Sequence, residues 1–582
     1  MNSSVGIPRR WSASDDGFPP SWDKVWRRLL LAVRLICWAV LIFAVMSRCS
    51  AVFVWDDSYM FYRYADNLIR YGDLTWNPAG QGTYGLTSPL FLILVLPIRV
   101  LFPGEPALTL YLSSMIAGFL FLALLLVLCD RFAGRSPLAG PLAKTIILFS
   151  VAVSVRPISA HFANGMDTTF AMAYLTAYLL LAKINEESRS IAGAVCMGLW
   201  GGLAFTARPD LMLYTVLVPV SIVLLSRNRE AKRNAALALG VTLGMCAAWL
   251  IFASWYFGSP LPLSFYAKGL RLYDETIYRA YGSTPIHELG GFVFSYWFLV
   301  LIIVADVFVN RGSWWNQTSD VDKSLIIPTM LFILYYAFFV LQIMPYHARF
   351  YYPTFPVIAY LGGVGAARLV ASIPESAKPR FIDAVWYHKR LLILAPVVAI
   401  LLGCAGFAYG IWKKGPAFVS LVTESNLYFN VHEDYAKRWR HHWFELDKFS
   451  GLSDDLMIAT TEVGLVAAMN PKKPIIDLAG LNETSIARHG FSGASFFKRY
   501  QPDLIYMPFP FYRGIISEII GHPDFRTTYE HFPADELGTA MGVAIRRSSR
   551  YYTEMRDLVR SGMKRHPVDA PGGGGAATNS EG

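Results

Sequence analysis

The feature that most constrains this chain is a series of apolar runs, each close to twenty residues long, which recur from Leu29 to Trp412. A helix needs about 20 mostly apolar residues to cross the hydrocarbon core of a bilayer. Charged residues make up only 16% of the 582 residues and hydrophobic residues 54%, whereas soluble domains carry roughly 25% charged residues. The sequence therefore predicts a polytopic α-helical membrane protein, and it excludes a disordered chain, a coiled coil and an ordinary cytosolic enzyme.

The runs predict about eleven transmembrane helices. The first, Leu29 to Ser47, is too long for a typical secretory signal and has no clear cleavage site after it, so we interpret it as a retained anchor. The others begin near residues 106, 144, 167, 190, 211, 234, 290, 325, 350 and 391. The apolar segment Pro89 to Phe102 would extend only about 21 Å as a helix, so we expect it to lie in the outer interface or to re-enter.

The positions of the basic residues predict the orientation in the membrane. With Pro89 to Phe102 left outside the count, the loops that contain Arg131, Arg227 and Lys389 all fall on the same side. Basic loops are typical of the cytoplasmic side, so the net charge of +10 needs no nucleic-acid partner. The odd number of spans places the chain after Trp412 outside the cytoplasm. We expect a multi-pass protein of the inner (plasma) membrane, in contact with the lipid bilayer, with its active site on the periplasmic side.

Four regions follow from this topology. They are a cytoplasmic N-terminal segment (1–28), a transmembrane domain (29–412) with a first outer loop (48–105), an extracytoplasmic α/β domain (413–555) and a flexible tail (556–582). The α/β domain is predicted because short apolar strands, such as 456–459 and 504–507, alternate with helix-like stretches.

The unusual polar residues lie at or beyond the predicted outer ends of the spans. A transporter is expected to place charges near the bilayer midplane, whereas here they gather where a lipid headgroup would lie. These residues are Asp56, Asp57, Arg63, His161, Asp167, Arg208, Asp210, Lys268, His347 and Arg349.

The first outer loop begins with two adjacent carboxylates, Asp56 and Asp57, followed by a helix-like aromatic stretch. Aspartate is a preferred helix cap, and it favours the positive end of the helix dipole. Adjacent side chains diverge on a helix or a strand, so we expect different tasks for the two, one catalytic and one capping or orienting. Tyr84, in a turn-rich part of the same loop, is suited to hydrogen bonding with a sugar.

Each of the other candidates has a second interpretation. Lys268 could bind a phosphate or merely meet anionic lipid. Arg349 is suited to bidentate phosphate recognition, although aromatic interface belts also recruit arginine. Asp167 either caps the following span or contacts substrate, and Arg208 with Asp210 forms either an interfacial ion pair or part of a site.

In order and spacing, the motifs from Trp55 to Leu481 resemble the GT-C superfamily of membrane glycosyltransferases. The terminal arabinofuranosyltransferase branch of mycobacterial cell-wall synthesis is the most similar. The matching motifs are Asp56-Asp57 with Arg63-Tyr64 and Asn67, Asn77-Pro78, Thr87-Ser-Pro89, Asn164-Gly-Met-Asp167, Arg208-Pro-Asp210, Phe265-Tyr-Ala-Lys268, Arg349-Phe-Tyr-Tyr-Pro353 and Ile475-Ile-Asp-Leu-Ala-Gly-Leu481.

The resemblance implies transfer of a sugar, arabinofuranose in that branch, from a polyprenyl-phosphate donor to a glycan or glycoprotein acceptor. Asp56 would then act as the general base on the acceptor hydroxyl, with Asp57 orienting or assisting, and the anomeric centre would be inverted. The expected substrate- and phosphate-binding residues are Arg63, Tyr84, His161, Asp167, Arg208, Asp210, Tyr266, Lys268, His347 and Arg349. The resemblance implies no certain cofactor, and a divalent metal ion stays open.

Two other classes remain as alternatives. A flippase or other transporter of lipid-linked glycans would show a charge-lined path through the membrane. A non-catalytic scaffold that binds a glycan would keep its function after loss of Asp56 and Asp57.

Overall fold

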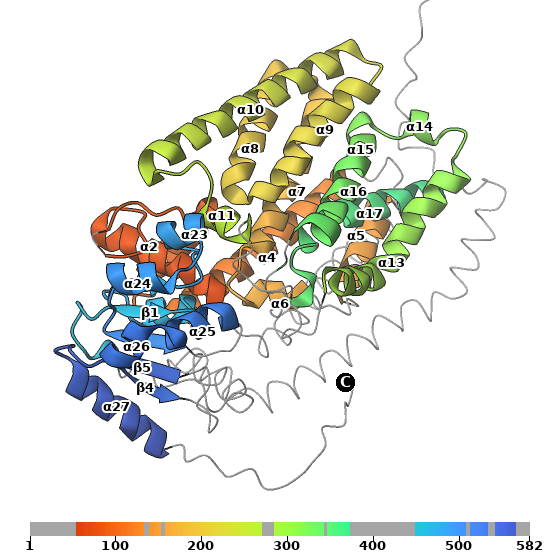
Figure 1. Ribbon diagram of the computed structural model, residues 1–582. Coiled ribbons are helices and arrows are strands. Elements are labelled where there is room, and N and C mark those ends of the chain that lie inside the picture. Colours follow the sequence, from red (N-terminus) through yellow and green to blue (C-terminus); the bar gives the residue numbers. More distant parts are fainter. Residues whose placement is uncertain are drawn as a thin grey trace, which may run out of the picture.

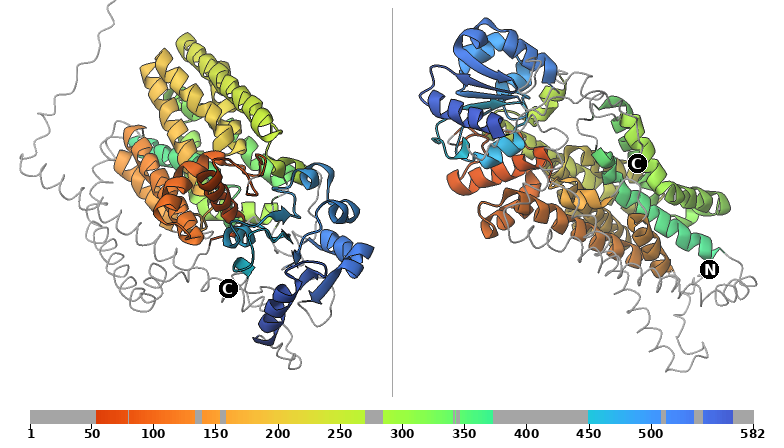
Figure 2. Two further views of the ribbon diagram at one scale, coloured as in Figure 1. Left: turned by 90° about the vertical axis from the view of Figure 1, so that its left-hand side faces the viewer. Right: turned by 90° about the horizontal axis from the view of Figure 1, so that it is seen from below.

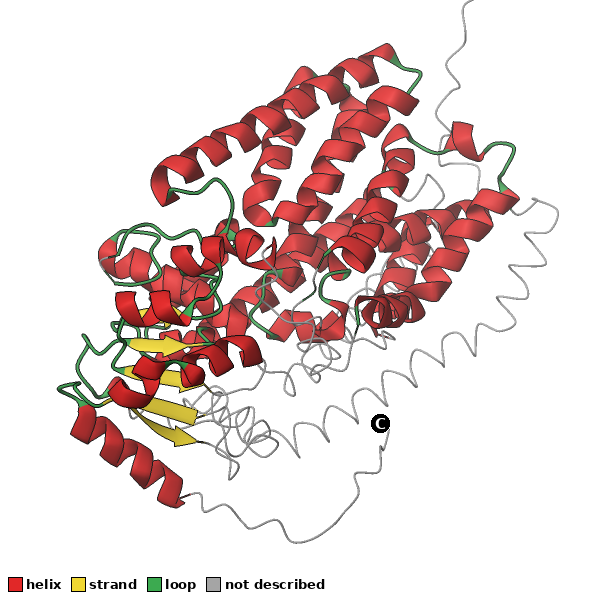
Figure 3. Cartoon of the chain, in the orientation of Figure 1, coloured by secondary structure: helices red, strands yellow, loops and turns green. Residues whose placement is uncertain are grey.

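The computed structural model describes residues 54–78, 80–132, 139–152, 158–269, 284–340, 342, 346–372, 449–507, 512–533 and 542–565. The predicted anchor Leu29 to Ser47, the span that begins near residue 391 and the N-terminal segment 1–28 lie outside these residues. Within them the chain is mostly helical, and the strands occupy one end of the molecule (Figure 3).

Five of the described helical segments are long and apolar enough to cross a membrane. They are Pro106–Phe132, Arg229–Phe257, Pro285–Val309, Asp320–Phe339 and Tyr352–Ala371. Their lengths follow from uninterrupted apolar sequence, because about 20 residues of helix match the hydrocarbon thickness. The chain is an integral membrane protein. The total of eleven spans and the orientation remain predictions.

The helices described before residue 373 include the five candidate spans and the helices between them. They are η1 (Asp56–Ser58), α2 (Tyr59–Tyr71), η2 (Pro89–Phe91), α3 (Leu92–Leu101), α4 (Pro106–Phe132), α5 (Ala139–Ala152), α6 (Ile158–Ala163), α7 (Thr168–Ser188), α8 (Ile191–Ala207), η3 (Pro209–Leu211), α9 (Met212–Leu225), α10 (Arg229–Phe257), α11 (Leu263–Gly269), α13 (Pro285–Val309), α14 (Trp314–Gln317), α15 (Asp320–Ser324), α16 (Ile326–Leu334), η4 (Tyr335–Phe339), η5 (Tyr346–Ala348), η6 (Tyr352–Thr354) and α17 (Phe355–Ala371).

Helix α3 covers the segment that was expected not to cross the bilayer. It is only 10 residues long, and Pro97 lies inside it. One face is apolar and buried at Val95 and Ile98, while Val100 and Leu101 are exposed. A short helix with one covered and one open apolar face fits the predicted place in the interface, which stays a prediction.

A mixed five-stranded sheet follows after residue 449. Its elements are β1 (Ile458–Thr460), α22 (Gly464–Met469), β2 (Ile475–Asp477), α23 (Thr484–His489), α24 (Gly493–Arg499), β3 (Leu504–Met507), α25 (Arg513–Gly521), α26 (Pro523–Thr528), β4 (Tyr529–Pro533), β5 (Gly542–Arg546) and α27 (Tyr552–Arg565). The strand order is β2-β1-β3-β5-β4. Strands β2, β1 and β3 are parallel, and β5 runs antiparallel to both β3 and β4.

The first ten residues of the region predicted as a tail (556–582) belong to a helix. Helix α27 continues through residue 556 to Arg565, because Met555 and Val559, one helical turn apart, are buried and the helix packs against β5. Residues 556–565, which the sequence assigned to the tail, are thus helical, and the division of the chain into regions stays a prediction. The extracytoplasmic location of the sheet stays a prediction.

The sheet lies directly beside the first outer loop, as Figures 1 and 2 show from three directions. We call the contact between residues 55–77 and residues 449–482 the seam. Arg63 lies at its centre, fully buried. Its guanidinium donates to the backbone carbonyls of Trp76, Ala467, Asn470 and Lys473 at 2.8 to 3.0 Å. The seam fixes the Asp56–Asp57 pair against the loop that follows β1.

Candidate active site

Three cations from separate elements converge around one aromatic ring. Arg208 follows α8, Lys268 ends α11 and Arg349 lies between η5 and η6. Their charged groups lie 5.9, 6.0 and 4.7 Å from the ring centroid of Phe350. We call Arg208, Lys268 and Arg349 the cationic cluster. A cation within about 6 Å of a ring centroid is attracted to the face of the ring, so Phe350 helps to hold three like charges together.

Carboxylates surround this cluster. Arg208 pairs with Asp210 at 3.0 Å, and Arg349 pairs with Asp57 at 3.6 Å. Tyr336 donates a hydrogen bond to Asp210, and Ser88 donates one to Asp167. Asp167 occupies the N-cap position of α7, yet its side chain makes no capping hydrogen bond. Its charge acts instead on the three cations.

Lys268 is the cation with the least compensation. Among the described residues its ammonium has no ion pair, in contrast to Arg208 and Arg349. Burial and repulsion from Arg349 lower the pKa of Lys268 to about 8, with a partial offset from Asp57. A buried ammonium with a lowered pKa gains stability when an anion binds beside it. The cluster is therefore suited to hold a phosphate.

An aromatic and histidine layer covers the cluster. Trp55 lies under the Arg349 guanidinium at 5.6 Å, and its ring stacks with His347 at 6.4 Å. His161 meets Trp55 edge-on, and its Nε2 contacts the backbone carbonyl of His347 at 3.0 Å. These contacts place both histidines beside Arg349, as the sequence had suggested, but as packing partners.

The backbone that carries Arg349 is strained. His347 and Ala348 have φ of 52° and 58°, a left-handed conformation that non-glycine residues seldom adopt. The buried carboxylate of Glu288 accepts a hydrogen bond from the Ala348 N–H at 2.8 Å and helps to hold this turn. Such strain is concentrated at functional sites, where the surroundings enforce it. Glu288 and Phe350 are site-forming residues that the sequence reasoning missed.

The two adjacent carboxylates have different surroundings, as expected. Asp57 faces Arg349, whereas the Asp56 carboxylate accepts hydrogen bonds from the N–H groups of Gly464 and Leu465 at 3.0 and 2.8 Å. Burial raises the pKa of Asp56 to about 6, against the opposing effect of these two hydrogen bonds. A side chain in place of the hydrogen of Gly464 would begin 1.8 Å from the backbone oxygen of Asp56, so the close approach requires glycine.

Three of the expected substrate-binding residues have structural partners, and their part in binding stays a prediction. Arg63 is engaged with backbone carbonyls of the seam. The Tyr84 hydroxyl accepts a hydrogen bond from Trp249, and its buried ring stacks on Phe257. Tyr266 accepts a hydrogen bond from Ser259 and lies under Arg488. Because these polar groups already have structural partners, we leave the three residues out of the proposed site.

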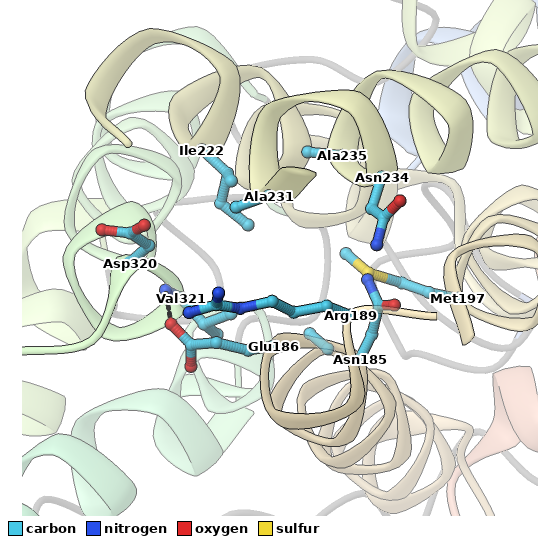
Figure 4. Close-up of a pocket in the computed structure, with 11 residues that line it drawn as sticks. Asn185, Glu186, Arg189, Met197, Ile222, Ala231, Asn234, Ala235, Asp320 and Val321 are labelled. Carbon is cyan, nitrogen blue, oxygen red and sulfur yellow. Dashed lines mark hydrogen bonds between the residues drawn. The ribbon is translucent and has the colours of Figure 1, made fainter. Parts of the chain in front are cut away.

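Two further features bear on ligands. Among the residues that the structure describes, no three His, Cys, Asp or Glu side chains converge as a metal site. A small, mostly apolar cavity lies between α7, α8, α9, α10 and α15, and its lining includes the polar residues Asn185, Arg189 and Asn234 (Figure 4). Since Arg189 precedes α8 and Arg208 follows it, this cavity and the cationic cluster lie at opposite ends of that helix.

Comparison with known proteins supports the fold. No protein-family profile matches the sequence, and no curated protein matches it. Among solved structures, ArnT from Cupriavidus metallidurans bound to undecaprenyl phosphate matches with a TM-score of 0.53 at 15% identity, covering 89% of this chain and 98% of ArnT.

The chain shares the fold of ArnT.

The apo state of ArnT gives a TM-score of 0.50 at 15% identity, over 90% of this chain and 98% of ArnT. Archaeal oligosaccharyltransferase AglB from Archaeoglobus fulgidus gives 0.44 at 13% identity, over 88% and 74%. The predicted multi-pass helical membrane fold is therefore shared with ArnT, and membership of the GT-C superfamily remains a prediction. The arabinofuranosyltransferase branch remains a prediction.

Proposed function

We propose that this protein is a glycosyltransferase that uses a polyprenyl-phosphate sugar as donor and an extracytoplasmic hydroxyl group of a glycan or glycoprotein as acceptor. The observation that carries the proposal is the convergence of Arg208, Lys268 and Arg349 on Phe350 beside the Asp56–Asp57 pair. Cations that bind a phosphate and a carboxylate that accepts a proton are the groups that this reaction needs.

The donor follows from the chemistry of the cluster and from the membrane. A phosphate has oxygens that arginine binds in bidentate fashion and that lysine meets as a point charge. The cluster residues lie at or beyond the predicted outer ends of the spans, where the headgroup of a lipid lies, so a phosphate on a lipid chain can reach them without leaving the membrane. ArnT, which shares the fold, binds undecaprenyl phosphate in its solved structure, and this supports the same class of donor here.

The proposed reaction is a single displacement. The acceptor hydroxyl oxygen forms a bond to the anomeric carbon while its proton passes to Asp56. The bond between the anomeric carbon and the phosphate oxygen breaks, and its electron pair stays on the phosphate. Lys268 and Arg349 stabilise the negative charge that develops there. The products are an inverted glycoside and the free polyprenyl phosphate.

Asp56 is our candidate for the base because a pKa of about 6 suits proton transfer near neutral pH. Its two backbone hydrogen bonds orient the carboxylate and leave lone pairs on both oxygens. Asp57 orients Arg349 through their ion pair. The same ion pair favours a second assignment, in which Asp57 is the base because it is the carboxylate that faces the cations.

The finer parts of the proposal concern the sugar and the location. We propose arabinofuranose as the first sugar to test, on the resemblance of the sequence motifs to the arabinofuranosyltransferase branch. We also propose that the site opens to the periplasmic side of the inner membrane, because the cytoplasmic side then receives the basic loops.

One experiment tests the activity. The purified protein in lipid nanodiscs is given a panel of labelled polyprenyl-phosphate sugars, with arabinofuranose first, and an octyl arabinofuranoside as acceptor. We expect transfer with inversion, and about 10²- to 10⁴-fold slower transfer by Asp56→Asn. A greater loss in Asp57→Asn than in Asp56→Asn would exchange the two roles. No transfer from any donor, or retention of configuration, would count against the proposal.

A further inference from the structure

The loop after β1 occupies a position in the sheet where ligands commonly bind. Strands β2 and β3 flank β1 on either side and run parallel to it. The chain leaves β1 through α22 to reach β2 and returns later on the other side through β3. Ligands of such sheets bind outside the carboxyl ends of the strands, at the point where the chain changes direction. In this protein that point carries Thr461 and Glu462.

The same loop touches the Asp56–Asp57 pair. The N–H groups of Gly464 and Leu465 bind the Asp56 carboxylate, and Glu462 precedes Gly464 by two residues. The Glu462 side chain interacts electrostatically with Asp56 and Asp57 from η1 and with Asp477 from β2. The carboxyl edge of the sheet therefore adjoins the Asp56–Asp57 pair.

Glu462 is buried and incompletely bonded. Only 5% of its surface is exposed, and its backbone is held by hydrogen bonds with the hydroxyl of Thr460. Within the described ranges neither Oε1 of Glu462 nor the hydroxyl of Thr461, which is 2% exposed, has a hydrogen-bond partner. A buried polar atom without a partner costs free energy, so a hydrogen bond from either atom to a polar ligand would be favourable.

Electrostatics favour the neutral form of Glu462. Burial, followed by the charges of Asp56, Asp57 and Asp477, raises the pKa of Glu462 well above its ordinary value. A third negative charge beside the Asp pair would repel both carboxylates. A neutral carboxyl group, in contrast, is a hydrogen-bond donor as well as an acceptor, which suits it to a sugar hydroxyl group.

We propose that Glu462 carries a proton and donates a hydrogen bond to a hydroxyl group of the acceptor sugar, adjacent to the hydroxyl that Asp56 deprotonates. This inference rests on the proposed function and extends it, since it gives the domain that follows residue 449 a direct part in binding the acceptor. The ligand class is a sugar with neighbouring hydroxyl groups. Glu462 is thus an acceptor-binding residue, and the proton of the reaction still passes to the base.

Two substitutions test the binding role. In Glu462→Gln the amide group can still donate a hydrogen bond, so we expect the KM for the octyl arabinofuranoside to stay within about threefold of the wild-type value. In Glu462→Ala the hydrogen-bonding group is lost, and we expect the KM for the octyl arabinofuranoside to rise about 10- to 100-fold. The KM for the polyprenyl-phosphate sugar should be unchanged. Glu483→Gln is the matched control, because its carboxylate binds Ser485 N–H and the Tyr500 hydroxyl away from the pair; it should leave both KM values unchanged.

A stability measurement tests the protonation state without any turnover. If Glu462 is neutral when folded and ionised when unfolded, the folded wild type loses stability relative to Glu462→Gln as pH rises above the ordinary glutamate value. The ratio of the two unfolding constants should then change about tenfold per pH unit, from the ordinary glutamate pKa up to the raised pKa of Glu462 in the folded protein. The Tm of Glu462→Gln should therefore increasingly exceed that of the wild type.

Three results would overturn the proposal. They are a Tm difference that does not change with pH, an acceptor KM in Glu462→Ala equal to that of the wild type, and a Glu462→Gln variant as impaired as Glu462→Ala. Failure of the wild type to transfer sugar from any donor would instead overturn the proposed function. The stability measurement would still report the protonation state of Glu462 in that case.

Discussion

Two regions that adjoin the first outer loop bury arginine in different ways. In the seam, Arg63 donates to four backbone carbonyls, which carry no net charge and cannot leave. In the cationic cluster, Arg208 and Arg349 face the side-chain carboxylates of Asp210 and Asp57, and a bound anion can take the place of such a partner. The comparison teaches that burial alone does not distinguish a structural arginine from a substrate-binding one. The distinction lies in the partners of the buried charge.

Among the cations of the cluster, Arg349→Gln is expected to have the largest effect on activity. Removing one member of a buried charge pair at a binding site costs about 2–5 kcal/mol, so kcat/KM for the lipid donor should fall at least 30-fold. The Tm should change little, since the partner carboxylate of Asp57 is 26% exposed and can be hydrated. Donor titrations and thermal unfolding measure the two quantities. A large loss of Tm would place Arg349 with Arg63 as a structural residue.

The reverse is expected for Arg63→Gln. A glutamine cannot satisfy the four carbonyls that Arg63 binds, and each buried unsatisfied group costs about 1–3 kcal/mol. We expect the free energy of unfolding to fall by about 3 kcal/mol, while the protein that remains folded keeps the donor KM of the wild type. Thermal unfolding and limited proteolysis of the seam report this loss. A raised donor KM with an unchanged Tm would return Arg63 to the substrate site.

The pH profile of kcat/KM should report the proposed base, Asp56, and the proposed phosphate-binding residue, Lys268, separately. Asp56 must be ionised to act as base, and its pKa is about 6, whereas Lys268 must be protonated to bind phosphate, and its pKa is about 8. The value of kcat/KM should therefore rise about tenfold per pH unit below about pH 6 and fall about tenfold per pH unit above about pH 8. Lys268→Arg should remove the upper limb, and persistence of that limb would show that another group controls it.

The smallest effect is expected for Tyr84→Phe. Loss of the hydrogen bond from Trp249 should cost about 1 kcal/mol of stability and leave kcat/KM within about twofold of the wild type. Steady-state kinetics with the arabinofuranosyl donor measure this. A tenfold rise in a KM would make Tyr84 a sugar contact after all.

Candidate site residues could be chosen from the sequence where a charged side chain lies at the end of a predicted span. Charges such as Lys268 and Arg349 stand out beside apolar runs, and the topology places span ends on one surface. The partners of Arg63 could not be predicted in this way, since Ala467 lies 404 residues further along the chain. Phe350 was missed because one ring in an aromatic-rich stretch cannot be distinguished from a lipid-facing belt. The role of Glu462 depends on the seam, which no local pattern encodes.

The most direct test of the account is a cryo-EM structure of the protein in lipid nanodiscs with undecaprenyl phosphate. The account predicts the phosphate within about 3 Å of the Lys268 ammonium and the Arg349 guanidinium, beside Phe350, with the lipid chain directed toward the bilayer. A phosphate bound elsewhere, with Arg349 still paired to Asp57 and Lys268 in contact with no anion, would contradict it.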